Sequence, residues 1–499
     1  MTKRVVVSAM CCALWVLTTG CGDECTDAFD CRADNGQPEA GQEWTCNENN
    51  ECEQRPVTQP PPPPVDAGTD AGTGGVDAGV DAGVDAGTDA GTDAGTDAGV
   101  DAGTDAGSMS VPKGEACISS GDCQAGLRCE GTPSLCQAMH VAVAVTRADL
   151  TAVVAVRHDD ANAAVVDLSE AAATSSRYAR WAPGGNAIAF VEGAEGAARL
   201  VTRSVPPVAG ETRTLTDSTD AGTRDFVYME WEPSSYIAWV RKSETSTSGI
   251  SAIQPDGGTV TTVTQNGVFP SWARDGMGFA YSTAADGIVR GMVGSSTTTP
   301  IAGAGAGAEQ PYHNRTNDQI LFLKPSATRP SEFNYELFTI PGAGGEAKEV
   351  ALLSTEAVTV GDVTGTVDSY IASPAWSPDG TWAAFVRAYY SSVSGAAPVL
   401  CGNESATLCP TREGNIIFLR RVGQDGAGTG AEIELARGAT LPSFSPDGRH
   451  IAYIKGGQLY VQPINPADGS TAGSVVQHAQ PTGVRTSGGD ESRPRWQPK

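Results

Sequence analysis

The C-terminal part of the chain alternates short apolar runs with polar turns in a pattern that recurs six times. In each copy an aromatic residue precedes a turn, and a second aromatic follows eight to ten residues later inside an apolar run. The clearest copies are PAWSPDGTWAAFV at 374–386 and PSFSPDGRHIAYI at 442–454. Proline fixes φ at the second position of such a turn, and glycine tolerates positive φ at the fourth. Each copy therefore predicts two antiparallel strands joined by a tight turn.

The spacing between the two aromatic residues is nearly constant. The six pairs are Trp181 and Phe190, Trp231 and Trp239, Trp272 and Tyr281, Tyr312 and Phe322, Trp376 and Phe385, and Phe444 and Tyr453. Because side chains alternate between the two faces of a strand, a constant spacing places these rings at equivalent positions in every copy. We expect the recurring tryptophans, with Trp496, to pack between repeats and not to form a sugar-stacking platform.

A third strand and a weaker fourth strand follow several copies, for example at 335–342 and 347–355. Four short antiparallel strands per repeat of roughly 40 to 65 residues are typical of a β-propeller blade. The repeat resembles that of the TolB-type, WD40-like propeller family, with its W-S-P-D-G…I-A-[FY] pattern, over about residues 141–499. The resemblance implies an all-β propeller and a protein partner in the cell envelope. TolB itself carries an α/β domain before its propeller, and no such pattern is visible here.

The two ends of the repeat region complement each other. Residues 493–498 contain a lone first strand, whereas 152–156 and 163–167 resemble a second and a third strand. If the C-terminal strand completes the N-terminal blade, the ring has seven blades and no exposed sheet edge there. The alternative is a six-bladed ring in which 140–147 is an added strand outside the blades.

The N-terminus carries an export signal. Lys3 and Arg4 precede an apolar run at 5–17, which is too short to span a bilayer and typical of a signal peptide over residues 1–20. The segment Leu17-Thr18-Thr19-Gly20-Cys21 resembles a bacterial lipobox, which implies lipid attachment at Cys21. We therefore expect an exported lipoprotein on the periplasmic side or the cell surface, with an ordinary secreted protein as the alternative.

Ten cysteines remain after the signal peptide and Cys21, in two groups of four and one pair. An even number in an exported chain predicts disulfides, and neither group has the C-x2-4-C spacing of a structural zinc site. The groups define cysteine-rich modules at 21–59 and 108–140, whose pairings the sequence leaves open. The last pair is expected to pin a loop inserted in a blade. The ten disulfide candidates are Cys25, Cys31, Cys46, Cys52, Cys117, Cys123, Cys129, Cys136, Cys401 and Cys409.

Residues 60–107 form a low-complexity linker between the modules. A proline run is followed by Val/Thr-Asp-Ala-Gly repeats that hold ten aspartates and no basic residue. Such a segment has too little apolar surface to fold, and its like charges favour an extended stalk of up to ~150 Å. Calcium-binding repeats of the β-helix type need a nonapeptide with large apolar residues, which this tetrad lacks.

Charge excludes several partners. Residues 1–140 hold 23 acidic and 6 basic side chains, and 141–499 hold 36 and 27, giving net charges of −17 and −9. With no strongly basic segment, neither nucleic acid nor binding to an anionic membrane through a basic patch is expected. A lipid at Cys21 is the predicted membrane contact.

Catalytic motifs are missing from the sequence. It holds no G-x-S-x-G, H-E-x-x-H, phosphate-binding or dinucleotide-binding pattern, so we expect no enzyme, no cofactor and no small-molecule substrate. The alternative is a metal-dependent lyase or hydrolase acting on sugars. Its metal would need the five scattered histidines, which are instead expected at surface or capping positions: His140, His158, His313, His450 and His478.

The favoured function is a cell-envelope lipoprotein whose propeller binds a protein partner or acts as a scaffold. Arg180, Glu230 and Arg495 each precede a blade aromatic. They are candidate partner contacts, although solvated surface charge is the simpler interpretation.

Overall fold

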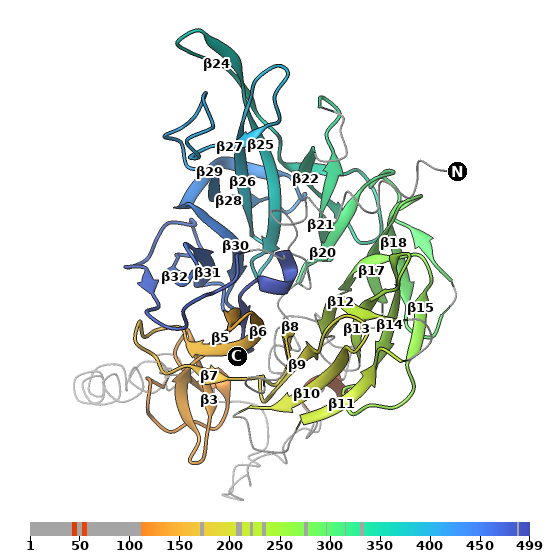
Figure 1. The fold of residues 1–499 in the computed structure, drawn as a ribbon. Coiled ribbons are helices and arrows are strands. Elements are labelled where there is room, and N and C mark those ends of the chain that lie inside the picture. The colour runs from red at the N-terminus through yellow and green to blue at the C-terminus, as the bar shows by residue number, and fades with distance from the viewer. Residues whose placement is uncertain are drawn as a thin grey trace, which may run out of the picture.

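Seven β-sheets surround a central axis in this computed structural model (Figure 1). The structure describes residues 42–46, 52–56 and 111–499, apart from 170–173, 206–211, 220–222, 232–235, 274–277, 296, 315, 330–333 and 487–488. Near the N-terminus, β1 (Gln42–Cys46) and β2 (Cys52–Pro56) pair antiparallel, which places the Cys46 and Cys52 backbones opposite each other. The predicted signal peptide, most of the first cysteine module and the stalk lie outside the described residues.

Each of these seven sheets is one blade, and in blades 2 to 7 neighbouring strands follow the order of the chain. Blade 2 holds β8 (Ser176–Trp181), β9 (Ala187–Glu192), β10 (Arg199–Ser204) and β11 (Thr212–Asp217). Blade 3 holds β12 (Asp225–Trp231), β13 (Ile237–Lys242), β14 (Thr247–Ile253) and β15 (Thr261–Thr264). Blade 4 holds β16 (Val268–Trp272), β17 (Gly278–Thr283), β18 (Gly287–Met292) and β19 (Thr299–Pro300).

The remaining blades complete the ring. Blade 5 holds β20 (Glu309–His313), β21 (Gln319–Pro325), β22 (Tyr335–Pro341) and β23 (Lys348–Ala351). Blade 6 holds β25 (Val363–Trp376), β26 (Trp382–Ser392), β28 (Asn415–Val422) and β29 (Gly428–Arg437), with two added strands, β24 (Thr355–Val360) and β27 (Val399–Leu400). Blade 7 holds β30 (Ala439–Phe444), β31 (His450–Lys455), β32 (Gln458–Pro463) and β33 (Val476–Gln477).

Blade 1 joins the two ends of the propeller. Its strand order is β34 (Arg495–Trp496), β5 (His140–Arg147), β6 (Leu150–Arg157) and β7 (Val166–Asp167). Arg495 pairs with Ala142 and Trp496 with Val141, so the C-terminal strand closes a seven-bladed ring as predicted. The predicted strand order within the blade is wrong by one place, because 140–147 is the second strand and not an added one. The segments at 152–156 and 163–167 lie in the third and fourth strands.

The recurring tryptophans pack between blades, as expected. The indole Nε1–H of Trp181 donates to Arg495 O (3.0 Å), Trp376 Nε1–H donates to Tyr312 O (3.0 Å), and Trp496 Nε1–H donates to Ser443 O (3.1 Å). In each case the acceptor lies on the inner strand of the preceding blade. In blade 5 the residue equivalent to the recurring tryptophan is His313 and not the predicted Tyr312. His313 pairs with Ile320 just as Trp376 pairs with Ala383 in blade 6, and Tyr312 lies one position earlier.

The inner strands of blades 2 to 7 share an irregularity. Each of these strands has a residue with positive φ three positions before its recurring aromatic residue, or before His313 in blade 5. The pairing register with the next strand shifts at this residue. These residues are Tyr178, Tyr228, Phe269, Gln310, Ser373 and Leu441, with φ between 49° and 57°. Because a non-glycine residue in this region costs roughly 1 kcal/mol, packing must hold each of these bulges in place.

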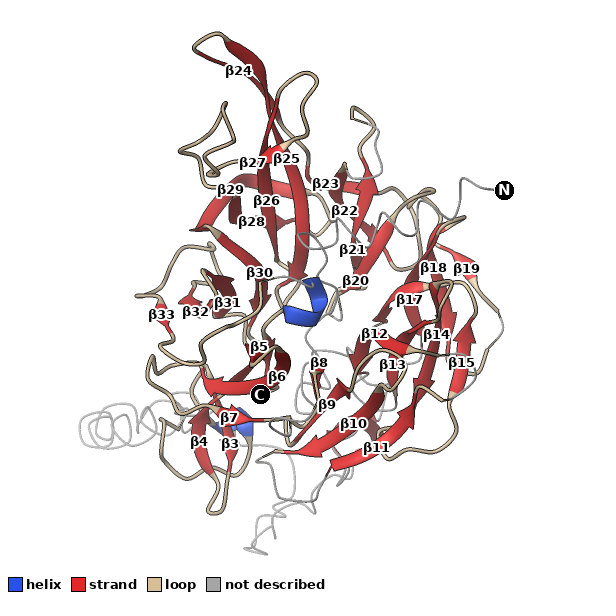
Figure 2. Cartoon of the chain, in the orientation of Figure 1, coloured by secondary structure: helices blue, strands red, loops and turns tan. Residues whose placement is uncertain are grey.

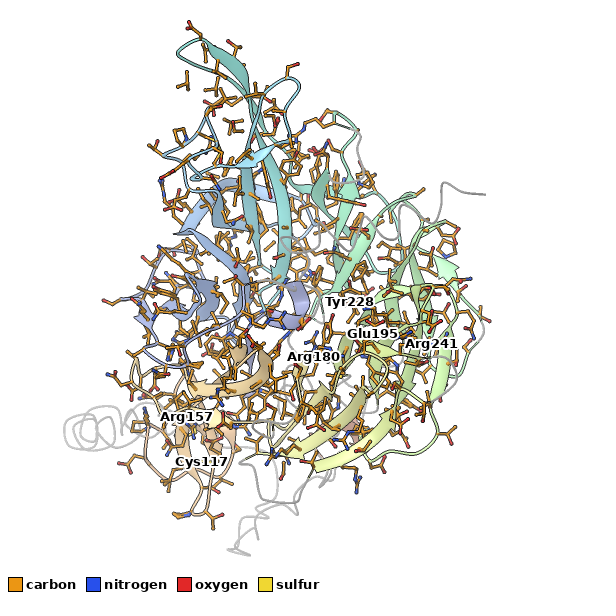
Figure 3. All side chains as sticks on the ribbon, viewed as in Figure 1. Cys117, Arg157, Arg180, Glu195, Tyr228 and Arg241 are labelled. Atoms are coloured by element: carbon orange, nitrogen blue, oxygen red, sulfur yellow. A yellow bond between two sulfur atoms is a disulfide. The ribbon has the colours of Figure 1, made fainter. Side chains whose placement is uncertain are left out.

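The second cysteine module covers the seam of the ring. It contains η4 (Ser120–Asp122), β3 (Leu127–Glu130) and β4 (Leu135–Ala138). Arg128 donates to the carbonyls of Pro498 and Gly184, and Gln497 Nε2 donates to Gly185 O at 2.8 Å. The module is therefore tied both to the C-terminal strand and to blade 2, beside the point where the ring closes. Figure 3 labels Cys117 in this module at the rim of the ring.

A short helix, η5 (Gly489–Ser492), lies in the middle of the ring (Figure 2). It contacts the strands β8, β12, β30 and β5, which belong to blades 2, 3, 7 and 1. Glu491 on this helix pairs with Arg485. The axis of the propeller is thus occupied by the chain segment that leads into β34.

Candidate functional site

The three charged residues predicted as partner contacts lie on inner strands and are buried. Arg180 is 3% exposed, Glu230 2% and Arg495 3%. Arg180 Nη2 lies 3.3 Å from Glu230 Oε1, which joins blades 2 and 3 by an ion pair. Solvated surface charge is therefore the wrong interpretation, because side chains this deeply buried are not part of the outer surface. Figure 3 places Arg180 and Tyr228 toward the middle of the ring.

An aromatic row follows the inner strands of blades 2, 3 and 4. The ring centroids of Tyr178 and Tyr228 are 6.3 Å apart, and those of Tyr228 and Phe269 are 4.6 Å apart. All three residues hold the positive-φ position of their strand. The bulge thus brings side chains of neighbouring blades together near the axis, a role that the aromatic–turn–aromatic pattern does not reveal.

The histidines are more buried than the sequence suggested. His158, His313 and His478 are buried, so the prediction that they occupy surface or capping positions is wrong for these three residues. The rings of His158 and His450 have centroids 4.8 Å apart at the seam between blades 1 and 7. Burial lowers the pKa of His158 to about 4, and the neighbouring His450 contributes to that shift.

Cysteines form disulfides in the described part of the second module and in blade 6. The pairs are Cys117–Cys129, Cys123–Cys136 and Cys401–Cys409. Among the described residues, the one group of potential metal ligands with closely spaced donor atoms is Cys117, Cys123 and Cys136. All three sulfurs belong to disulfides and are not available as thiolates. Cys21, Cys25 and Cys31 lie outside the described residues.

Blade 6 carries a projection that is not found in the described residues of the other blades. We call residues 355–367 the blade-6 arm; it is a hairpin of β24 and the start of β25, and it extends beyond the ring at the top of Figure 1. β24 pairs on one side with β25 and forms the end of its sheet. Its residues are mostly exposed, and Val360 at the tip is 46% exposed. A strand edge of this kind is a ready template for another strand.

The pairing of the arm shows which residues form this free edge. Val360 pairs with Val363 across the two-residue loop Gly361-Asp362, so this closing pair is hydrogen-bonded. Bonded and non-bonded pairs then alternate along the hairpin, which turns the backbone N–H and C=O groups of Thr355, Ala357 and Thr359 away from β25. The side-chain hydroxyls of Thr359 and Thr364 lie 3.2 Å apart, as expected for a close non-bonded pair.

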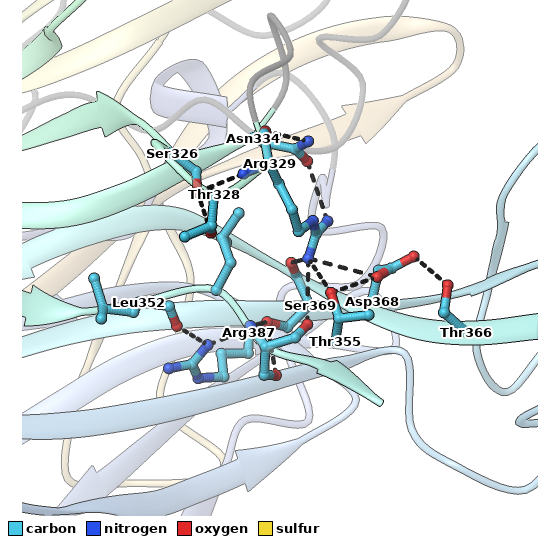
Figure 4. A network of polar contacts seen from close by, with 12 residues as sticks. Ser326, Thr328, Arg329, Asn334, Leu352, Thr355, Thr366, Asp368, Ser369 and Arg387 are labelled. Atoms are coloured by element: carbon cyan, nitrogen blue, oxygen red, sulfur yellow. Dashed lines mark hydrogen bonds and ion pairs between the residues drawn. The ribbon is translucent and has the colours of Figure 1, made fainter. Parts of the chain in front are cut away.

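A polar network fixes the base of the arm to blade 5 (Figure 4). Arg329 Nη1 donates to Ser354 O (3.2 Å) and Ser369 O (3.3 Å), and it lies 3.6 Å from Asp368 Oδ1. Thr355 Oγ1 donates to the same carboxylate oxygen at 2.8 Å. Charge-assisted hydrogen bonds from one guanidinium to both strands make the arm a rigid extension of the blade.

A second arginine anchors the same strands from within blade 6. Arg387 Nη1 donates to Leu352 O (2.8 Å) and Ser369 Oγ (3.3 Å). Its Nε and Nη2 donate hydrogen bonds to the two carboxylate oxygens of Glu432, at 2.8 Å and 2.5 Å. The arm is thus held at its base from both sides.

The disulfide-stapled loop supports the arm laterally. Cys401, Leu408 and Cys409 form a small apolar cluster with Val367 and Tyr389, against which Val358 and Val363 of the arm pack. Arg412 lies 3.7 Å from the centroid of the Tyr389 ring and 3.2 Å from Glu356 Oε2. The sequence predicted this loop but not the arm, although TEAVTVGDVTGTV holds the Gly-Asp turn and Val/Thr alternation typical of a hairpin.

Comparison with known proteins finds the propeller in solved structures only. No model of a protein family matches the chain, and no curated protein matches its sequence. TolB from Acinetobacter baumannii is 15% identical with a TM-score of 0.36, covering 72% of this chain and 82% of its own. The propeller is similar to that of TolB. A protein assigned as TolB from Agrobacterium tumefaciens is 17% identical with a TM-score of 0.37, covering 64% and 99%.

Another similar structure is an oligogalacturonate lyase in complex with manganese, 11% identical with a TM-score of 0.40, covering 67% of this chain and 84% of its own. At these identities the likeness concerns the fold alone, and the seven sheets themselves establish the propeller. In the described part of the chain, no helix is both long and apolar enough to cross a membrane.

Proposed function

We propose that this chain is an exported, lipid-anchored binding protein of the cell envelope, and that the blade-6 arm carries its contact with a partner protein. The observation that carries the proposal is the free edge of β24 on a hairpin that is braced at its base. Natural proteins usually cover or shorten such edges, because an uncovered edge pairs with other chains. A partner strand added to this edge would gain main-chain hydrogen bonds at little ordering cost to the arm.

The arm also suits a partner strand by its chemistry. Thr355, Ala357 and Thr359, whose backbone groups face outward, have small and uncharged side chains, which leave room for a neighbouring strand. The single carboxylate of β24, on Glu356, is paired with Arg412. An extended, uncharged segment rich in β-branched residues is the partner that this edge would accept most readily.

Crosslinking in the native envelope tests the proposal when an edge variant is compared with a matched control. Ala357→Pro removes one outward N–H without removing a hydrogen bond to β25, whereas Ala357→Ser keeps that N–H. We expect Ala357→Pro to lose the crosslinked partner at least tenfold and Ala357→Ser to retain it. Equal capture by the two folded variants would contradict the role of the arm.

The proposed anchor has its own test. Signal-peptide cleavage before Cys21 would expose the thiol that a lipid modifies, and one lipid-bearing terminus would hold the stalk and propeller to a membrane. We expect Cys21→Ala to move the protein from the membrane fraction to the soluble exported fraction. The protein's mass by mass spectrometry, with and without the substitution, gives an independent reading of the lipid.

A further inference from the structure

The free edge of β24 is complementary to itself. The backbone groups that face away from β25 belong to Thr355, Ala357 and Thr359, which are spaced symmetrically about Ala357. Two such edges related by a two-fold axis run antiparallel, as an isologous contact between identical chains requires. Ala357 then lies opposite Ala357 of the second copy, and Thr355 lies opposite Thr359. Each of these pairs is hydrogen-bonded, so the contact gains about six main-chain hydrogen bonds.

The charge on β24 selects this register over its neighbours. A two-fold axis at Glu356 would place two carboxylates directly opposite each other, which is unfavourable. An axis at Val358 loses one of the hydrogen-bonded pairs. With the axis at Ala357, Glu356 lies opposite Val358, and its charge is balanced by Arg412 of its own copy, 3.2 Å away.

Exposed apolar side chains lie at both ends of the arm. Leu352 at the base is 41% exposed and Val360 at the tip is 46% exposed, and they are two of the five large apolar residues that the described chain leaves exposed. With the axis at Ala357, Val360 of one copy lies opposite Ser354 of the other, two positions from Leu352. A second copy would therefore cover apolar surface at both ends of the contact.

We propose that the strand bound by the blade-6 arm is β24 of a second copy of this chain, paired antiparallel about Ala357. The inference rests on the proposed function of the arm and names its partner. The arm extends beyond the ring, so its edge is accessible (Figure 1). Arg329 and Arg387 hold its base, so little order is lost when the two arms meet.

The expected dimer is weak in solution. Two six-residue strands bury less than the ~1,200 Å² of a standard stable interface. The net charge of −26 also opposes association, and salt screens that repulsion, so the dimer should strengthen as the ionic strength rises. Anchoring of both copies to one membrane would raise their effective concentration.

Disulfide trapping in the full-length exported protein tests the register. Cα atoms of a hydrogen-bonded antiparallel pair are about 5.5 Å apart, within reach of a disulfide. We expect Ala357→Cys to form a covalent dimer under mild oxidation with copper phenanthroline. The matched control, Thr359→Cys, is equally on the exposed edge, but it lies opposite Thr355 and roughly 13 Å from its own counterpart. It should form at least tenfold less dimer alone, yet crosslink when mixed with Thr355→Cys.

Analytical ultracentrifugation gives a second reading without new cysteines. The wild type and Ala357→Ser are expected to dimerise reversibly with the same dissociation constant, and Ala357→Pro is expected to weaken the dimer at least tenfold. No covalent dimer of Ala357→Cys, equal trapping of Ala357→Cys and Thr359→Cys, or equal dimerisation of folded Ala357→Pro and the wild type would overturn the inference.

These outcomes are distinguishable from failure of the proposed function. If the purified protein stays monomeric at every salt concentration while Ala357→Pro still loses its crosslinked partner in the envelope, another protein supplies the strand and only the present inference is wrong. If Ala357→Pro and Ala357→Ser retain the same partner in the envelope, the arm itself has no binding role there and both proposals are wrong.

Discussion

At the scale of single residues, the indole N–H groups between blades have unequal surroundings. Trp376 donates to Tyr312 O of the preceding blade, whereas Trp272, at the same place in its own blade, is buried and its Nε1 has no hydrogen-bond partner among the described residues. The chain therefore offers a matched pair of sites that differ by one hydrogen bond. The sequence predicted that both rings pack between blades, but their hydrogen bonds depend on the bulged strand of the neighbouring blade, which has no local signature.

Substituting each tryptophan by phenylalanine isolates that bond. Trp376→Phe and Trp272→Phe remove similar buried volume, but only the first removes an indole hydrogen bond to a backbone carbonyl of the described residues. We expect Trp376→Phe to lower the free energy of unfolding by about 1 kcal/mol more than Trp272→Phe. Urea unfolding of the two variants measures the difference, and equal losses would show that the bond contributes nothing net.

At the scale of elements, the contact between the cysteine module and the seam is expected to lose stability as the pH falls. Burial lowers the pKa of His158 to about 4, and burial together with Arg157 lowers the pKa of His140 to about 4. In the unfolded chain both titrate near 6.5. The unfolded state therefore binds more protons between about pH 6.5 and 4, so stability is lost as the pH falls through that window.

The difference between the folded and unfolded pKa values sets the size of the loss of stability. Between pH 7 and pH 5 we expect the free energy of unfolding to fall by about 2 kcal/mol for each of the two histidines. His158→Phe keeps a ring in the site and removes one proton-binding group, so its loss between pH 7 and pH 5 should be about 2 kcal/mol smaller than that of the wild type. Denaturant unfolding at both pH values provides the measurement. An unchanged pH dependence in His158→Phe would show that this ring does not titrate as described.

The elements also show where sequence patterns stop being informative. Periodic apolar runs and Pro-Asp-Gly turns predicted the blade strands, because both depend on neighbours in the chain. The sequence correctly assigned the first strand of blade 1 to the C-terminus, but it placed 152–156 one position too early, because the neighbouring apolar runs at 140–147 and 150–157 look alike in sequence. Packing of Gly126 of the module beside His158 and His450 leaves no local pattern either. The burial of Arg180 and Glu230 likewise depends on the bulge and on the neighbouring blade.

At the scale of the whole molecule, stability depends on a short closing strand. β34 holds only Arg495–Trp496, yet Trp496 is buried and Gln497 N donates to His140 O at 2.8 Å. Without it, β5 becomes a free sheet edge and the seam loses its largest ring. Arg128 of the module would also lose the Pro498 carbonyl.

Removing this strand is therefore expected to open the ring. A variant lacking residues 495–499 should lose more than 4 kcal/mol of stability and aggregate through the exposed edge of β5. A variant lacking Lys499 alone, which keeps β34 intact, is the control. Thermal unfolding and size-exclusion chromatography follow the two effects. A monomer with an unchanged melting temperature after the longer truncation would contradict the closing role of β34.

The closing blade also has a kinetic consequence. The backbone of His140 is bonded to a side chain 357 positions away in the sequence, so the last contacts of the ring join nearly the whole length of the folded domain. Such contacts form late, because the entropy of closing a very long loop must be lost before they contribute anything. Until the ends meet, blade 1 lacks its first strand and β5 has an unpaired edge. We therefore expect the encounter of the two ends to limit the rate of folding, and the unpaired edge to favour misassembly before it.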